Sequence, residues 1–159
     1  MIDIFDKKYK IASILYIMSN NNNNTASVHS NDPTNMDFSF KYTESGGLTA
    51  RYLLISYDSK TNILTSSTDI SGSNISQKPL DDTEKSDLKN VITENEFFIA
   101  KTDYPPEKED PSLVSYNLTV TMADKTHTTA WTNASKELPK GITKIVDEIK
   151  KVVAKEKAV

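Results

Sequence analysis

The sequence predicts an α+β domain in which an antiparallel sheet of four to five strands carries two helices on one face. Two observations lead to this fold class. Apolar and polar residues alternate in several short segments, as they do in half-buried strands. Two other segments place apolar residues three and four positions apart, which is typical of amphipathic helices. In chain order, these segments give β-β-β-α-β-β-α.

Residues 1–35 are expected to form an arm outside this domain. Lysines precede a short apolar run, Ile11 to Met18, as in a signal peptide, but the run has only eight residues and the small-residue cleavage site is poor. Five consecutive asparagines, Asn20 to Asn24, cannot bury apolar surface and therefore predict a disordered linker. We expect one domain over residues 36–159, and both an exported and a cytoplasmic location stay open.

Residues 36–68 predict three strands. The segment from Met36 to Tyr42 alternates strictly between apolar and polar residues, as a half-buried strand does. Gly46 and Gly47 then interrupt the pattern and predict a turn or bulge. The segment from Thr49 to Tyr57 has apolar groups on both faces, which indicates an inner strand. Residues 63–68 are expected to return beside it as a hairpin.

The next segments predict a helix and a stiff acidic loop. Asp81 and Asp82 follow Pro79 and can satisfy the free amides of a helix that ends near Asn95. Phe97 and the following phenylalanine are expected to enter the core. Residues 71–79 are expected to form a polar loop. Residues 104–111, YPPEKEDP, predict a second loop, because three prolines exclude a helix or an inner strand.

The last third of the chain predicts two strands and a helix. The segment from Val114 to Met122 gives the clearest alternation in the sequence, and Thr126 to Thr132 is expected to return beside it. The final helix is expected to begin near Pro139. Its apolar residues follow helical spacing: Ile142, Ile145, Val146, Ile149, Val152 and Val153.

Composition narrows the classes of function. The net charge of −3 and the pI near 5.4 argue against a nucleic-acid binder, which needs a clustered basic surface. Residues 81–111 carry ten acidic and four basic groups, whereas residues 136–159 carry seven lysines and four acidic groups; we interpret both as solvated surfaces. The absence of cysteine excludes disulfides and thiolate chemistry. No apolar stretch approaches the ~20 residues of a membrane span.

The inventory of catalytic residues is thin. Of the two histidines, His29 lies in the arm and His127 lies on a predicted strand, so a histidine zinc site is not expected. The carboxylates Asp81 and Asp82 are explained as helix-cap residues, and the acidic loop lacks the glycine and spacing of a calcium loop. We therefore expect no catalytic activity, no metal, no cofactor, and a monomer.

The glycine pair of Gly46 and Gly47, followed by Leu48, is the most suggestive binding feature. A turn of paired glycines that carries an apolar residue between two strands can serve as a recognition loop. A purely structural interpretation stays open at this point, and composition alone favours it: the glycines would make the turn, and Leu48 would pack inward.

Over residues 38 to about 153, the order of these features resembles the emfourin-like family of protealysin inhibitors. The resemblance rests on elements distributed along the chain: Glu44 to Leu48, then Leu80, Leu88, Val91 and Ile92, then Phe97 and Phe98, Tyr104 to Pro106, Asp110, Tyr116, Leu118 and Val120, His127 to Trp131, and Pro139. It implies an α+β protein inhibitor of thermolysin-like (M4) zinc metallopeptidases, without catalytic residues of its own. The arm of residues 1–35 departs from the compact family pattern.

A mechanism follows if the resemblance holds. Thermolysin-like enzymes favour a bulky apolar side chain just after the scissile bond, and Leu48 on a rigid Gly46–Gly47 turn could enter that pocket. Tyr104, Pro105 and Pro106 are candidates for a second contact.

The alternative is a secreted or cell-surface binding module without inhibitory activity. The basic, apolar start of the chain favours this alternative, as do four Asn-x-Ser/Thr sequons, at Asn23, Asn74, Asn117 and Asn133.

Overall fold

The computed structural model describes residues 36–155, which form an α+β domain. The predicted arm over residues 1–35 lies outside the described residues. The helices are α2 (Asp82–Glu94), the short 3₁₀ helix η2 (Phe97–Ile99) and α3 (Lys140–Ala154). The strands are β1 (Phe38–Gly46), β2 (Arg51–Asp58), β3 (Ile63–Ser67), β4 (Ile75–Pro79), β5 (Asp103–Tyr104), β6 (Val114–Met122) and β7 (Lys125–Thr132).

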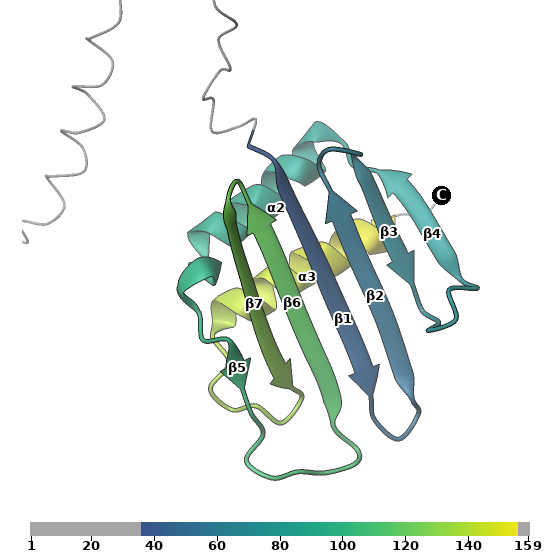
Figure 1. Ribbon diagram of the computed structural model, residues 1–159, viewed down its shortest axis with the longest axis vertical. Helices are drawn as coiled ribbons and strands as arrows, with labels where there is room; N and C mark the ends of the chain where they lie inside the picture. Colours follow the sequence, from purple (N-terminus) through teal and green to yellow (C-terminus); the bar gives the residue numbers. More distant parts are fainter. Residues whose placement is uncertain (1–35, 156–159) are drawn as a thin grey trace, which may run out of the picture. The chain divides into compact units, whose positions relative to one another are not determined.

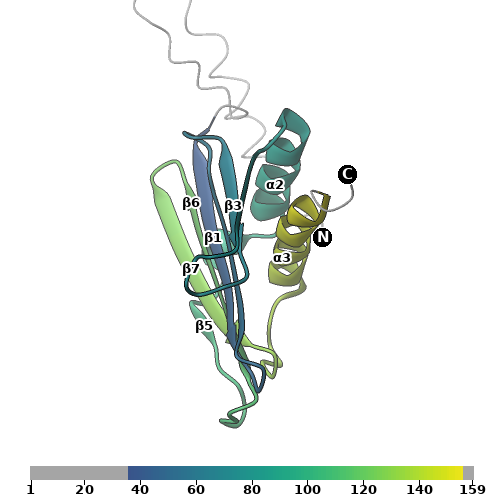
Figure 2. The same cartoon turned by 90° about the vertical axis from the view of Figure 1, so that its right-hand side faces the viewer.

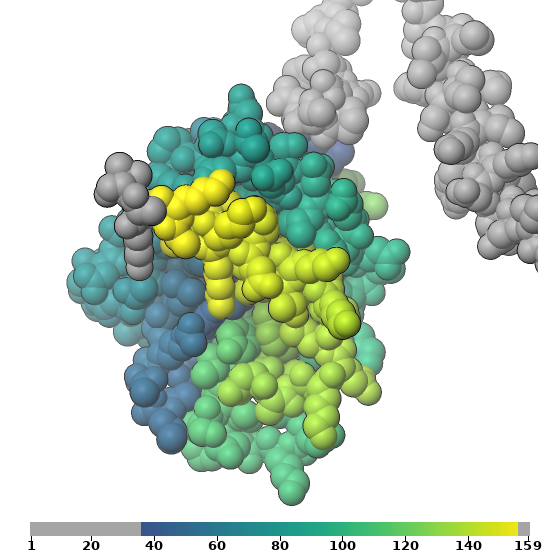
Figure 3. All heavy atoms as spheres, turned by 180° about the vertical axis from the view of Figure 1, so that it is seen from behind, coloured from purple at the N-terminus to yellow at the C-terminus, as the bar shows by residue number. Residues whose placement is uncertain are grey.

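The strands make one sheet in the order β4-β3-β2-β1-β6-β7-β5, with β1 at its centre (Figure 1). Neighbouring strands are antiparallel except β5 and β7, which are parallel. Both long helices cover the same face of the sheet (Figure 2). Seen from the helix side, the end of the sheet that carries the β1–β2 turn extends beyond α3 (Figure 3). The turns at that end are therefore free of helix cover.

The sheet is larger than the sequence predicts, with seven strands instead of four to five. The polar segment expected to be a loop contains β4, which pairs with β3 from Ser67 opposite Ile75 to Ile63 opposite Pro79. Because β4 is an edge strand, it needs no apolar pattern on two faces, and a proline is tolerated at its end. The other added strand, β5, is two residues long and pairs with Ala130 and Trp131 of β7. Apart from the short helix η2, the observed order of the elements is therefore β-β-β-β-α-β-β-β-α.

The core lies between the sheet and the two helices. Alternate residues of β1 (Phe38, Phe40 and Tyr42) face the helices and are almost fully buried. Phe97 is fully buried, as expected, whereas Phe98 is only partly buried and packs against the core. The helices contribute their predicted apolar stripes to this core: Leu88 and Ile92 from α2, and Ile142, Ile145, Val146, Ile149 and Val152 from α3.

Both long helices begin where the sequence predicts. Asp81 caps α2 by accepting a hydrogen bond from the Glu84 amide at 2.7 Å, and the Glu84 carboxylate accepts one from the Asp81 amide at 3.2 Å. This reciprocal pair is a capping box, which satisfies two backbone amides at the helix end. The cap residue of α3 is Pro139, one position outside the helix. Asp81 and Asp82 therefore lie at the start of a helix, as expected.

Candidate functional site

The candidate site is the turn between β1 and β2, at the uncovered end of the central strand. Gly46 pairs with Arg51, so residues 47–50 make the connection. The Ala50 amide donates to the Gly47 carbonyl oxygen at 3.1 Å, which closes the turn. Ala50 has a φ of 49°, in the left-handed region. The turn thus has a defined backbone conformation, and its apolar tip, Leu48, is 86% exposed.

The two glycines have a backbone role that the sequence suggested. Gly46 has a φ of 99° and Gly47 a φ of 75°, which other residues rarely adopt. The Gly47 amide donates to the Leu113 carbonyl oxygen at 2.9 Å. A Cβ atom on Gly46 would lie 2.9 Å from that same oxygen. The structural interpretation therefore holds for the glycines but not for Leu48, which points into solvent instead of packing inward.

The loop of residues 105–113 lies against this turn, because Leu113 accepts the Gly47 hydrogen bond. The loop is organised by Asp110, whose carboxylate accepts from the Ser112 amide at 2.7 Å and whose carbonyl oxygen accepts from the Leu113 amide at 3.0 Å. Hydrogen bonding to Ser112 lowers the pKa of Asp110. Two segments distant in sequence are thus joined at one end of the sheet.

The three residues of the second predicted contact, Tyr104 to Pro106, differ in exposure. Tyr104 is 5% exposed, and its hydroxyl accepts from the Lys101 amide at 3.1 Å. Its carbonyl oxygen accepts a hydrogen bond from the Ser135 hydroxyl. Pro105 is exposed and Pro106 half-buried. Tyr104 therefore anchors the loop in the fold, and the prolines are the part of this segment that a partner can reach.

Glu44 is the residue of this region that sequence reasoning missed. It is fully buried at the base of the hairpin, where its Oε1 accepts from the Tyr42 hydroxyl at 2.8 Å. The Arg51 guanidinium lies 2.7 Å from its Oε2 as an ion pair without hydrogen-bond geometry, and the Lys150 ammonium of α3 forms a second ion pair with Oε1. The carboxylate therefore connects β1, β2 and α3 just below the exposed turn.

A second turn exposes an apolar tip. Residues 68–74, between β3 and β4, carry Ile70, which is 83% exposed. Asp69 organises this turn by accepting from the Ser71 amide at 2.9 Å and the Ser73 amide at 3.3 Å. Hydrogen bonds from Ser71, its hydroxyl first, lower the pKa of Asp69 to about 2. Ile70 is thus a matched comparison for Leu48, since both are branched apolar residues on ordered turns.

The histidine and carboxylate residues described by the structure are not arranged as a metal site. Within residues 36–155, no three histidine, aspartate or glutamate side chains are placed to hold a metal ion. His127 packs edge-on against Phe97, with ring centroids 5.2 Å apart, and its Nε2 is buried without a hydrogen-bond partner in that same part of the chain. Over the same range, no helix combines the length and apolar character that crossing a membrane requires.

Comparison with protein-family models and with curated proteins identifies no relative. The sequence matches none of the protein-family models, and no curated protein matches it. The emfourin-like resemblance therefore stays a prediction.

The burial of Tyr42 and its contact with Glu44 should make the free energy of unfolding fall as the pH becomes alkaline. Burial, followed by the hydrogen bond to Glu44, raises the pKa of Tyr42 above its ordinary value. A raised folded-state pKa means that this stabilisation is fully present below about pH 10, where the unfolded tyrosine is neutral, and is lost as pH rises further. We expect the free energy of unfolding to fall by up to about 1.4 kcal/mol per pH unit from this group.

Urea unfolding between pH 9 and pH 11.5, compared with Tyr42→Phe, measures this contribution. The variant should have a shallower pH dependence, because phenylalanine has no hydroxyl to ionise. Parallel pH curves for the two proteins would show that Tyr42 does not carry the effect.

Proposed function

We propose that this domain inhibits a thermolysin-like zinc metallopeptidase by tight binding near the active site, with Leu48 as the primary contact. The observation that carries the proposal is the 86% exposure of Leu48 on a turn whose backbone is held by two positive-φ glycines. Large apolar side chains that stand out from an ordered turn are well suited to fill a partner's pocket. The class of partner, a thermolysin-like metallopeptidase, comes from the resemblance to the emfourin-like inhibitors.

The order of the turn supports tight binding. The Gly47 amide bonds to Leu113, and the Ala50 amide closes the turn on Gly47. Glu44 and Arg51 form an ion pair across its base. A loop that is already ordered loses little conformational freedom when it binds, so more of the contact energy appears as affinity.

The neighbouring loop provides a second contact. Pro105 is exposed and stiff, and the carboxylate of Glu107 forms an ion pair with Lys136 at 2.7 Å. Because Leu113 at the other end of the same loop bonds to Gly47, the two contact elements are connected. In this proposal the inhibitor supplies shape and apolar surface, and the peptidase supplies the zinc.

Leu48→Asp is expected to weaken inhibition of a thermolysin-like enzyme at least tenfold, a loss of about 1.4 kcal/mol or more. An aspartate would bring a hydrated charge into an apolar pocket. The measurement is the inhibition constant of the full chain against such an enzyme, with thermal melting to confirm an unchanged fold.

Ile70→Asp is the matched control, because it places the same charge on another exposed turn and is expected to leave inhibition unchanged. Equal inhibition by wild type and Leu48→Asp would reject the assignment of Leu48. No inhibition by the wild type at about 10 μM, where a contact worth about 7 kcal/mol would register, would count against that enzyme as the partner.

The alternative function, a secreted or cell-surface binding module, is favoured by one observation. Asn74 is exposed in the turn before β4 and begins a sequon with Ile75 and Ser76. Such an asparagine is accessible to glycosylation if the chain is exported. Mass spectrometry of the native protein decides this point: a processed N-terminus with a glycan on Asn74 would support export.

A further inference from the structure

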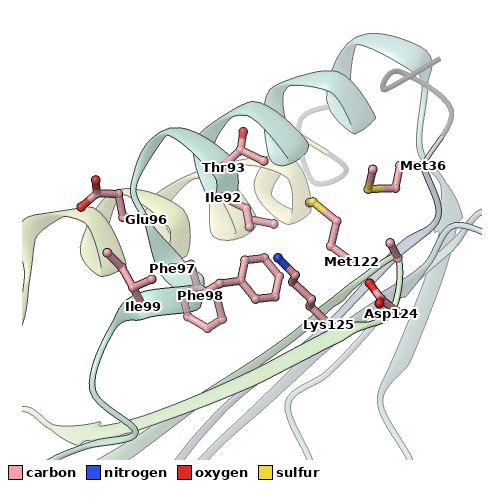
Figure 4. Close-up of a pocket in the computed structure, with 11 residues that line it drawn as sticks. Met36, Ile92, Thr93, Glu96, Phe97, Phe98, Ile99, Met122, Asp124 and Lys125 are labelled. Carbon is pink, nitrogen blue, oxygen red and sulfur yellow. The ribbon is translucent and has the colours of Figure 1, made fainter. Parts of the chain in front are cut away.

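A cavity of about 620 Å³ opens between the C-terminal end of α2, the short helix η2 and the turn between β6 and β7 (Figure 4). It lies away from the β1–β2 turn and plays no part in the proposed inhibition. Its volume falls in the range of about 300 to 1,000 Å³ that is typical of small-molecule sites. Its walls are mainly apolar: Met36, Ile92, Phe97, Phe98, Ile99 and Met122.

The floor and the rim of this cavity differ in exposure. Ile92 and Phe97 at the floor are fully buried, whereas Ile99 is 78% exposed and Met36 is 41% exposed. Large apolar side chains left open to solvent around a hollow are typical of a binding site, because closing the hollow removes them from water. The surface therefore suits an apolar ligand that can extend from the floor to the rim.

Lys125 adds a positive charge to this apolar hollow. Figure 4 shows the Lys125 ammonium directed between Phe98 and Met122. The Glu96 carboxylate points away from the Phe98 ring in the same view. Within residues 36–155, no carboxylate lies in ion-pair distance of the Lys125 ammonium. Two acidic residues line the cavity: Glu96 and Asp124, which directly precedes Lys125 in the chain.

The backbone holds Lys125 at this position. Met122 pairs with Lys125 across the tight β6–β7 turn. Ala123 within that turn has a φ of 54°, and its amide donates to the Asp37 carbonyl oxygen at 3.0 Å. The turn is therefore tied to Asp37, just before β1, and this contact fixes the root of the Lys125 side chain at the rim of the cavity.

We propose that this cavity binds an amphiphile with an unbranched apolar tail and a carboxylate head, the chemistry of a medium-chain fatty acid. The apolar walls would contact the tail, and the Lys125 ammonium would form a charge-assisted hydrogen bond with the head. The pairing is strengthened beside apolar walls, because less water screens the two charges than in bulk solution. The positive charge of Lys125 favours a carboxylate head over an uncharged head on the same tail.

The test uses the full chain labelled with ¹³C at the methionine methyl groups, because Met36 and Met122 line the cavity. Dodecanoate, below its micelle concentration, is titrated against dodecanol and dodecylammonium, which have the same tail and a different head. We expect the methyl signals of Met36 and Met122 to shift with dodecanoate. Its affinity should exceed that of dodecanol at least tenfold.

Lys125→Met keeps an unbranched side chain that is one atom shorter and removes its charge, so it should reduce the dodecanoate affinity at least tenfold and leave dodecanol binding unchanged. Lys41→Met is the control, because Lys41 is an exposed residue of β1 whose neighbours Phe40 and Tyr42 face the helices, so that its side chain lies on the opposite face of the sheet. It should bind dodecanoate as the wild type does.

Three results would each overturn the proposal. The first is the absence of any methyl shift with dodecanoate. The second is equal binding of the three amphiphiles, and the third is a dodecanoate affinity that Lys125→Met leaves unchanged. The second and third would assign the cavity to apolar side chains or uncharged ligands. None of these results bears on inhibition by the β1–β2 turn, whose test is independent.

Discussion

Glu44→Ala is expected to lower the free energy of unfolding by about 2 to 4 kcal/mol, because it empties a fully buried position and leaves the Tyr42 hydroxyl without its acceptor. A buried polar group without a partner costs about 1 to 3 kcal/mol, and the cavity adds to this. The cations contribute less, since the side chains of Arg51 and Lys150 are 53% and 40% exposed and can return to water. Urea unfolding at pH 7 measures the loss.

Two further variants separate the causes. Glu44→Gln keeps an oxygen acceptor for Tyr42 and removes the charge, so it should cost less than alanine. The double variant Glu44→Leu with Tyr42→Phe removes both polar partners and should recover much of the stability, because an apolar pair leaves nothing unsatisfied. A loss below about 1 kcal/mol for Glu44→Ala would contradict this account of the buried carboxylate.

Gly46→Ala is expected to lower the free energy of unfolding by about 2 to 6 kcal/mol, through two effects that add. A φ of 99° costs a residue with a Cβ atom about 1 to 3 kcal/mol. The new Cβ would also lie 2.9 Å from the Leu113 carbonyl oxygen, which belongs to the backbone and cannot rotate away. Overpacking of this kind costs about 1 to 3 kcal/mol.

Gly72→Ala is the control for the backbone effect alone. Gly72 has a φ of 74°, and a Cβ there would meet only the end of the Ile75 side chain, at 3.7 Å. It should therefore cost about 1 to 2 kcal/mol. The difference between the two variants in urea unfolding reports the clash with Leu113, and equal losses at both positions would show that no clash occurs.

Most of the fold could be predicted because the core residues carry its pattern. The alternation through Phe38, Phe40 and Tyr42 locates β1, and the spacing in α3 locates the helix that covers it. The edge strands could not be found this way. In β4, no residue is buried, so no apolar period marks it. The two-residue β5 depends on hydrogen bonds to β7, which the sequence of β5 does not encode.

The candidate site was predictable in part. The glycine pair indicated a turn, since positive φ values favour glycine, and the structure adds that Leu48 points outward. Glu44 was missed because its charge interrupts the apolar alternation of Phe38, Phe40 and Tyr42, although its position in the strand continues the buried face. The cavity between α2, η2 and the β6–β7 turn combines residues from three distant segments, and only folding brings Met36, Phe98 and Lys125 together.

The hydrogen bond from Gly47 to Leu113 has a mechanical consequence. It fastens the tip that carries Leu48 to the start of β6, while the tip itself grows out of β1, the middle strand of the sheet. A pull on Leu48 is thus shared among β1, β2 and β6, each hydrogen-bonded on both sides. Strands bonded on both sides resist shear better than edges do, so the tip is mounted where the domain is hardest to deform.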